Sequence, residues 1–109
     1  MKLEKALRSI IALIVQCCDP DKVVLFGSYA KGRNRLDSDL DILVIGDFQD
    51  SPYLRAHELQ DLLARFPIRI DLHLVTPQEL AMESQRPYGF LSRVQRNSIL
   101  LYQKPEKEA

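Results

Sequence analysis

Hydrophobic and polar residues recur along this chain with two different periods, which separate the expected helices from the expected strands. Apolar residues three and four positions apart predict an amphipathic helix over residues 2–18. These residues are Leu3, Leu7, Ile10, Ile14 and Cys17. The dipeptide Asp19-Pro20 is expected to end this helix, because proline disfavours helical backbone in the residue before it.

Three later segments are expected to be the strands of the core. Val23–Phe26 is a short apolar run that stops abruptly at Gly27. In Asp39–Ile45 and Ile68–Val75, the strand period of two divides the side chains between a core face and an opposite face. The second of these strands places Ile70, Leu72 and Leu74 on its core face.

Proline positions predict two helices around the third strand. Ser51-Pro52 resembles an N-cap followed by proline at the first helical position, so a helix is expected from there to about Arg65, ending before Pro67. Its apolar residues are Leu54, Leu59, Leu62 and Leu63. After the third strand, residues 76–79 read Thr-Pro-Gln-Glu, the pattern of a capping box, and predict a short helix to about Glu83.

The C-terminal part of the chain is expected to hold a final helix, an apolar segment and a tail. Residues 88–97 predict the helix, with a buried stripe at Phe90, Leu91 and Val94. Ile99–Tyr102 is the apolar segment that closes the domain. Residues 104–109 are polar and are expected to fray.

This order of elements predicts an α/β or α+β fold, a two-layer domain with a mixed β-sheet and helices packed on one face. With 109 residues, the chain is long enough for a single core and too short for a second module. We therefore expect one domain over residues 1–103, followed by the polar tail at 104–109.

Charge and cysteine content narrow the classes of function. Fifteen basic residues balance fifteen acidic ones, and the local cluster Lys31, Arg33 and Arg35 is small, which argues against broad nucleic-acid binding. The adjacent Cys17 and Cys18 are expected to be buried thiols in a reducing compartment, without a structural disulfide.

The first residues do not read as a targeting or membrane segment. They carry too many charges for a signal sequence, at Lys2, Glu4, Lys5 and Arg8. The apolar stretch Ile10–Val15 is too short to cross a bilayer. A cytoplasmic protein with no membrane association is expected.

The most informative chemistry lies at the start of the second strand. Alternation sends Asp39 and Asp41 to one face, side by side. Two such carboxylates disfavour each other's ionisation unless a cation lies between them, and Mg²⁺ binds carboxylates together with substrate phosphates. An isolated Asp-x-Asp is more often a solvated strand edge, so the neighbouring loop decides between the two readings.

That loop follows the first strand and begins with Gly27-Ser28. Glycine permits a tight turn, and the Ser28 hydroxyl with nearby backbone N–H groups can bind terminal phosphates. Standing alone, the dipeptide would be an ordinary turn. A Walker-type loop is excluded, because Gly32 is followed by Arg33-Asn34 where that motif requires Lys and Ser or Thr.

The combination of Gly27-Ser28, ten intervening residues, and Asp39-x-Asp41 resembles the signature of the DNA polymerase β-like nucleotidyltransferase superfamily. Residues 25–32 and 38–44 resemble most closely its small prokaryotic branch, the minimal nucleotidyltransferases. The motif occupies about residues 23–45, while length and element order resemble this branch over nearly the whole chain.

The resemblance implies a third carboxylate on a later strand, and Asp71 is the candidate. Its implied role is to bind metal and to accept the proton of the attacking hydroxyl. Arg69 and His73 share its face; either could touch phosphate, metal-bound water or the acceptor, and an ion pair or a packed strand histidine explains them equally well. Lys31 could screen a triphosphate, or could belong to a solvated loop.

The resemblance also implies the reaction: transfer of AMP from ATP to a hydroxyl group, with two Mg²⁺ ions held by Asp39, Asp41 and Asp71, and with Gly27, Ser28 and Lys31 at the phosphates. By family analogy the acceptor is a HEPN-type helical toxin, neutralised by this chain as antitoxin. A homo-oligomer is possible. A small-molecule, antibiotic-type nucleotidyltransferase and a noncatalytic nucleotide- or partner-binding module are the alternatives.

Overall fold

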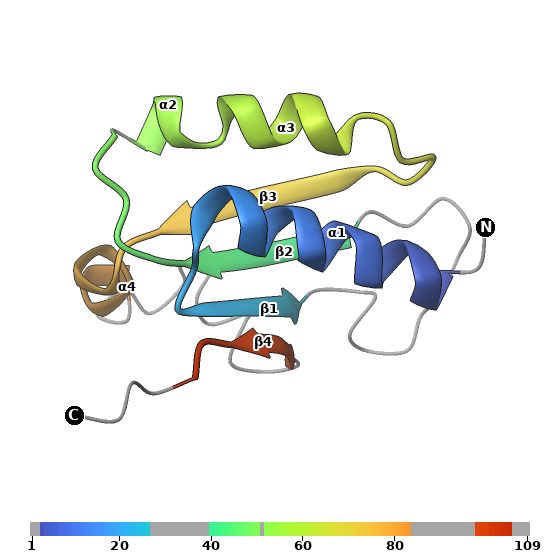
Figure 1. Ribbon diagram of the computed structural model, residues 1–109. Helices are drawn as coiled ribbons and strands as arrows, with labels where there is room; N and C mark the ends of the chain where they lie inside the picture. The colour runs from blue at the N-terminus through green and yellow to red at the C-terminus, as the bar shows by residue number, and fades with distance from the viewer. Residues whose placement is uncertain (1–2, 27–39, 51, 84–97, 106–109) are drawn as a thin grey trace.

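The computed structural model describes residues 3–26, 40–50, 52–83 and 98–105, in which helices and strands alternate (Figure 1). The elements in chain order are α1 (Leu3–Cys18), β1 (Lys22–Phe26), β2 (Leu40–Ile45), α2 (Pro52–Arg55), α3 (His57–Leu63), β3 (Ile70–Val75), α4 (Pro77–Glu83) and β4 (Ser98–Gln103). The predicted α+β fold with a mixed sheet is confirmed. The helix expected over residues 88–97 lies outside the described residues.

The strands form one sheet of four in the order β3-β2-β1-β4. β2 pairs with β3 in parallel, and β1 pairs antiparallel with both β2 and β4. The sequence predicted three strands and gave no element type to Ile99–Tyr102. That segment lies in β4, an edge strand whose register with β1 shifts between Val23 and Val24.

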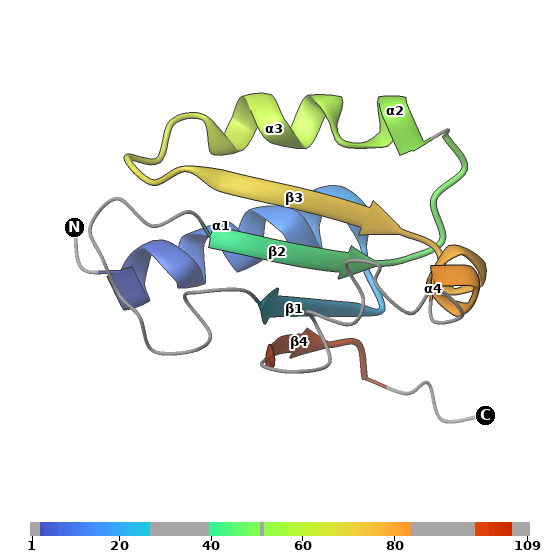
Figure 2. The ribbon, with the colours of Figure 1, turned by 180° about the vertical axis from the view of Figure 1, so that it is seen from behind.

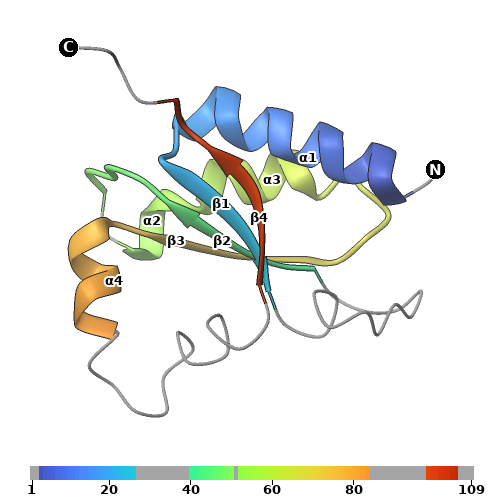
Figure 3. The ribbon, with the colours of Figure 1, turned by 90° about the horizontal axis from the view of Figure 1, so that it is seen from below.

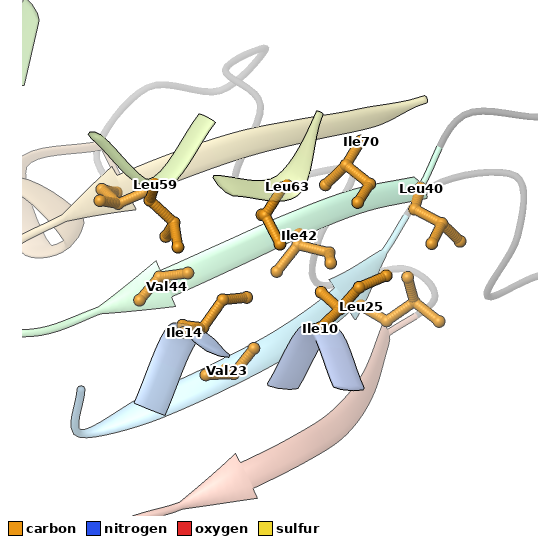
Figure 4. Close-up of a cluster of buried hydrophobic side chains, with 11 residues drawn as sticks. Ile10, Ile14, Val23, Leu25, Leu40, Ile42, Val44, Leu59, Leu63 and Ile70 are labelled. Atoms are coloured by element: carbon orange, nitrogen blue, oxygen red, sulfur yellow. The ribbon is translucent and has the colours of Figure 1, made fainter. Parts of the chain in front are cut away.

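One face of the sheet is covered by α1 and α3, as Figures 1 and 3 show from two directions. The side chains between these layers are aliphatic and almost completely buried (Figure 4). They are Ile10, Ile14, Val23, Leu25, Leu40, Ile42, Val44, Leu59, Leu63, Ile70 and Leu74. Burying such side chains is the main contribution to folding, at roughly 1.5–3 kcal/mol each.

The opposite face, seen from behind in Figure 2, carries a smaller apolar cluster. Phe26 and Leu43 are buried there, and Leu80 of α4 packs against them. The helices α1 and α3 therefore share one face of the sheet, as expected, while α4 lies at one end of the sheet and contacts the other face through Leu80.

The expected helix from residue 51 to about 65 is two helices, because the chain turns at Ala56 between α2 and α3. The Arg55 side chain, at the end of α2, bonds to Asp50 and Leu74 rather than to neighbouring helical residues. Leu54 is 57% exposed, so the apolar stripe predicted across this region is interrupted at its first member.

Two predicted helix ends are confirmed. Asp19 adopts a positive φ of 45° and its N–H donates to the Val15 carbonyl at 3.0 Å, which ends α1 before Pro20. At the start of α4, the Thr76 N–H donates to Glu79 Oε1 at 2.9 Å and the Glu79 N–H donates to Thr76 Oγ1 at 3.1 Å. These reciprocal bonds form the expected capping box.

The prediction of two buried thiols is wrong for Cys17, which is exposed, because it falls on the solvent side of α1. Cys18 is half-buried, and this burial raises its pKa, with smaller contributions from Cys17 and Glu58. Both cysteines are free, and neither is paired in a disulfide.

Lys104, the first residue after β4, is hydrogen-bonded to the turn between α1 and β1. The Lys104 N–H donates to the Asp21 carbonyl at 2.8 Å, and Lys104 Nζ donates to Asp19 Oδ2 at 2.8 Å. The bond to Asp19 raises the pKa of Lys104. In the described parts of the chain, no helix has the length and apolar character needed to cross a membrane.

Candidate active site

Asp41 and Asp71 are brought together by the parallel pairing of β2 and β3. The two residues are direct partners in the register, and both are half-buried. Adjacent strands are about 4.8 Å apart, so partnered residues hold their side chains next to each other on the same face. Two of the three predicted carboxylates are thus neighbours, although they are thirty positions apart in sequence.

Alternation along the strands explains why these carboxylates face away from α1 and α3. The residues on either side of Asp41, Leu40 and Ile42, are fully buried in the large aliphatic core. Ile70 next to Asp71 is in the same core. Burial of these alternate residues fixes the register, because a slip of one residue would exchange carboxylates for aliphatic side chains.

The end of β1 lies beside the same site. Phe26 is the register partner of Asp41, so the chain leaves the sheet next to that carboxylate and re-enters it at Leu40. The predicted phosphate-binding residues Gly27, Ser28 and Lys31, and the first carboxylate Asp39, belong to this connection and lie outside the described residues. The topology nevertheless attaches both ends of the connection near Asp41.

His73 shares the face of Asp71 and is in contact with β1. Its ring centroid is 5.4 Å from that of Phe26, at an interplanar angle of 53°. Phe26 is fully buried, so this contact favours the packing interpretation of His73 that the sequence left open. Arg69 is exposed and lies just before β3.

The described carboxylates suit a hard divalent cation in chemistry and position. Mg²⁺ binds oxygen ligands and commonly takes one or two carboxylates from the protein, which Asp41 and Asp71 can supply. Within residues 3–26, 40–50, 52–83 and 98–105, no group of three or more potential ligands is clustered closely enough to hold a metal. The predicted set depends on Asp39 for its third member.

A network of hydrogen bonds from Arg55, which the sequence analysis missed, holds the C-terminal end of β3 in place. Arg55 donates to the Leu74 carbonyl at 3.1 Å, to Glu79 Oε1 at 2.5 Å and to the Asp50 carbonyl at 2.6 Å. The Arg55 carbon Cζ also lies 5.3 Å from the ring centroid of Phe48. With its side chain only 5% exposed, Arg55 links the connection after β2 to α4 and to the strand that carries Asp71.

Glu79 acts in this network as an anion. Its pKa is lowered, first by the hydrogen bond from the Thr76 backbone and then by the bond from Arg55. The capping-box pattern pointed to Glu79, but no local spacing connects it with an arginine 24 residues earlier.

An open groove of about 540 Å³ runs from the end of α3 to Asp71. One side is formed by Gln60 and Leu63 of α3 and by Ala64, which directly follows that helix. The other lining residues belong to the connection to β3 and to the first residues of that strand: Phe66, Pro67, Ile68, Arg69, Ile70 and Asp71. The groove therefore leads directly to one of the candidate catalytic carboxylates.

Two curated proteins resemble this chain in sequence. A Methanocaldococcus jannaschii protein named "Putative protein adenylyltransferase MJ1305" is 33% identical over 95 residues, covering 77% of this chain and 65% of that protein. A second protein of that organism with the same description, MJ1215, is 37% identical over 59 residues, covering 53% of this chain and 65% of its own length. The chain thus spans just under two thirds of the length of these curated relatives.

A solved structure described as a toxin-antitoxin with AMP-PNP shares the fold. It is 25% identical with a TM-score of 0.63, and the match covers 89% of this chain and 73% of that one. The family model for the nucleotidyltransferase domain matches residues 1–97. The matched residues include both paired carboxylates, Asp41 and Asp71. The chain therefore belongs to the nucleotidyltransferase domain family.

Proposed function

We propose that this chain is a Mg²⁺-dependent nucleotidyltransferase that transfers AMP from ATP to a hydroxyl group of a protein. The observation that carries the proposal is the direct pairing of Asp41 with Asp71 beside the point where β1 ends. Membership of the nucleotidyltransferase domain family supports the reaction type. The two relatives, each named "Putative protein adenylyltransferase", support a protein acceptor.

In the proposed reaction, the acceptor oxygen attacks the α-phosphorus of ATP and the bond to the bridging oxygen breaks, so pyrophosphate leaves. Asp71 accepts the hydroxyl proton, and Asp39, Asp41 and Asp71 hold two Mg²⁺ ions. When bound, these ions supply positive charge that offsets the triphosphate. Gly27, Ser28 and Lys31 bind the β- and γ-phosphates.

The proposed partner is a HEPN-type helical toxin, which this chain neutralises as antitoxin. The support is the structure described as a toxin-antitoxin with AMP-PNP, which is 25% identical to this chain. Lack of net charge also favours a protein acceptor over nucleic acid. We place the activity in the cytoplasm, on the evidence of two free cysteines among the described residues.

Two other functions use the same fold. A small-molecule nucleotidyltransferase would label a hydroxylated compound without any protein partner. A noncatalytic module would bind ATP or a partner and transfer nothing. The register pairing of two carboxylates favours the catalytic interpretations, because placing two acidic groups side by side costs free energy unless a cation offsets them.

Incubation of the purified chain with α-labelled ATP and Mg²⁺ tests the three functions, with and without a co-purified helical protein. Label on the protein partner supports adenylylation, and label on added aminoglycoside-like compounds supports the small-molecule alternative. ATP binding without transfer in any mixture would reject catalysis and leave the binding module.

A further inference from the structure

The outer edge of β3 carries backbone hydrogen-bonding groups that point away from β2, and the groove that leads to Asp71 lies at the start of this edge. In the parallel ladder, the Leu40 N–H donates to the Arg69 carbonyl at 2.9 Å and the Gly46 N–H donates to the Val75 carbonyl at 3.0 Å. Odd-numbered residues of β3 therefore bond to β2. The N–H and C=O groups of Ile70, Leu72 and Leu74 lie in the plane of the sheet and point away from β2, toward the free side of β3.

Only part of this outward edge is used within the described chain. Arg55 bonds to the Leu74 carbonyl at 3.1 Å and so occupies the far end. The outward groups of Ile70 and Leu72 meet no donor or acceptor among the residues that the structure describes. An edge of this kind is a template for pairing with another extended chain.

A groove adjoins the start of this edge, next to the end of α3. Figures 1 and 3 show α3 on the same face as α1 but displaced toward the outside of β3, the outermost strand. Its last turn and the start of β3 form the two walls of the groove of about 540 Å³. The groove is lined by aliphatic and aromatic carbon from Leu63, Phe66 and Ile68, with the exposed Arg69 on the strand side.

From this geometry we infer that the groove binds an extended polypeptide segment of the acceptor protein, which adds to the edge of β3 and presents a hydroxyl side chain to Asp71. The inference rests on the proposed function and specifies how its acceptor is held. The added segment bonds to the outward groups of Ile70 and Leu72, as in other cases of strand addition.

Strand addition also determines which side chain reaches the carboxylate. A residue directly opposite Asp71 on the added strand has its side chain on the same face, with Cβ atoms about 5 Å apart. Its hydroxyl is then within reach of Asp71, the proposed proton acceptor. An acidic residue elsewhere in the segment complements Arg69 on the groove wall.

A polypeptide fits these features better than a nucleic acid. The alternating donors and acceptors of a strand edge match another peptide backbone, whereas phosphates would require a cluster of basic groups. The groove lining contains one basic side chain, Arg69, and also Asp71, which would repel a phosphate backbone.

The test measures peptide binding by fluorescence anisotropy of dye-labelled seven-residue peptides, and a separate assay measures transfer of label from ATP to the same peptides. The peptides are rich in β-branched residues, carry one glutamate, and have a central serine or tyrosine; matched peptides have alanine or phenylalanine there. All should bind the intact chain, while only the hydroxyl forms should take label from ATP. Binding of an oligouridylate in the groove, in place of the peptides, would overturn the inference.

Two pairs of variants locate the binding. Ala64→Trp fills the groove from an exposed position and should weaken peptide binding by about tenfold or more. Arg65→Trp, at the next exposed residue, which does not line the groove, should leave it within about twofold. Equal effects of the two changes would overturn the assignment of the groove.

The second pair tests strand addition itself. Leu72→Pro removes an outward N–H without removing a bond to β2, and Leu72→Ala controls for the lost side chain. We expect the proline variant to bind peptide about tenfold more weakly than the alanine variant, with both folded by circular dichroism. Equal affinities of the folded variants would exclude pairing at this edge.

The same experiments separate this inference from the proposed function. Groove-dependent peptide binding without any transfer of label would reject the catalytic proposal and leave the docking groove standing. Transfer to the partner protein that Ala64→Trp does not slow would leave the catalytic proposal standing and reject the groove.

Discussion

The two faces of the sheet differ in what their side chains do, although they are built from the same strands. On the face under α1 and α3, Ile42 is fully buried among aliphatic side chains. One residue earlier in the chain, Asp41 lies on the opposite face, beside Asp71. Stability and the candidate chemistry are therefore assigned to alternate residues, so substitutions one position apart should affect different properties.

The largest expected effect is on the chemical face. Asp41→Asn keeps the size of the side chain but removes a negative charge from the proposed metal site. Transfer of label from ATP should fall by about a thousandfold, equivalent to about 4 kcal/mol, because the triphosphate loses the cation that offsets it. Rates of label transfer at saturating Mg²⁺ measure this.

The matched control is Asp61→Asn, on the exposed surface of α3, which should change neither rate nor stability appreciably. If Asp41→Asn retains the full rate of transfer, Asp41 is not a metal ligand in the reaction, and catalysis does not depend on this face of the sheet.

The aliphatic face should respond in the opposite way. Ile42→Ala removes buried methyl and methylene groups from the centre of the core, and we expect a loss of about 3 kcal/mol in the free energy of unfolding. The rate of transfer per folded molecule should change little. Urea denaturation, combined with the transfer assay on the folded fraction, measures both quantities.

If Ile42→Ala is as stable as the parent chain, the buried aliphatic cluster of Figure 4 is not the main source of stability. A stable variant with a greatly reduced rate would show that the two faces are coupled.

The connections at the far end of β3 offer a third comparison, between a buried and an exposed arginine. Arg55→Ala leaves the carbonyls of Asp50 and Leu74 without the Arg55 donor and removes the guanidinium partner of Glu79, whose carboxylate keeps the bond from the Thr76 N–H. We expect a loss of about 2 kcal/mol in the free energy of unfolding. The exposed Arg65→Ala should change stability by less than about 0.5 kcal/mol. Similar urea midpoints for the two variants would contradict the role of Arg55.

What the sequence predicted well depended on local periodicity. The face of Asp41 and Asp71, the end of α1 at Asp19 and the capping box at Thr76 each follow from a few consecutive residues. Local patterns are reliable there because the strand period and the caps act through neighbours in the chain. Family resemblance added the reaction type, which periodicity alone does not contain.

What the sequence did not predict depends on contacts between distant residues. β4 has two exposed apolar residues, Ile99 at 47% and Leu100 at 54%, so it lacks the clean alternation of a strand with one buried face. Arg55 bonds to Glu79 only in the folded chain, where α4 lies next to the end of α2. The break between α2 and α3 lies at Ala56, directly after Arg55, and no proline or glycine marks it in the sequence.

The smallest expected effect concerns the charge of Glu79 and depends on pH. The folded state lowers the pKa of this carboxyl below its ordinary value of 4.5, mainly through the Thr76 backbone bond and then through Arg55. The ionised form therefore stabilises the fold; its contribution is complete above the ordinary pKa and is lost as pH falls through the lowered one. Glu79→Gln retains a capping side chain but removes the charge.

Urea midpoints of the parent chain and of Glu79→Gln should accordingly differ by a constant amount well above pH 4.5 and converge below it. Glu58→Gln, at an exposed position on α3, serves as the matched control, because it removes a carboxylate charge outside the Arg55 network. Because Arg55 is fixed by three other contacts, the loss of one charge should shift the midpoint less than Arg55→Ala does. A gap that widens as the solution is acidified would have the wrong sign, and would show that the charge of Glu79 does not stabilise the end of β3.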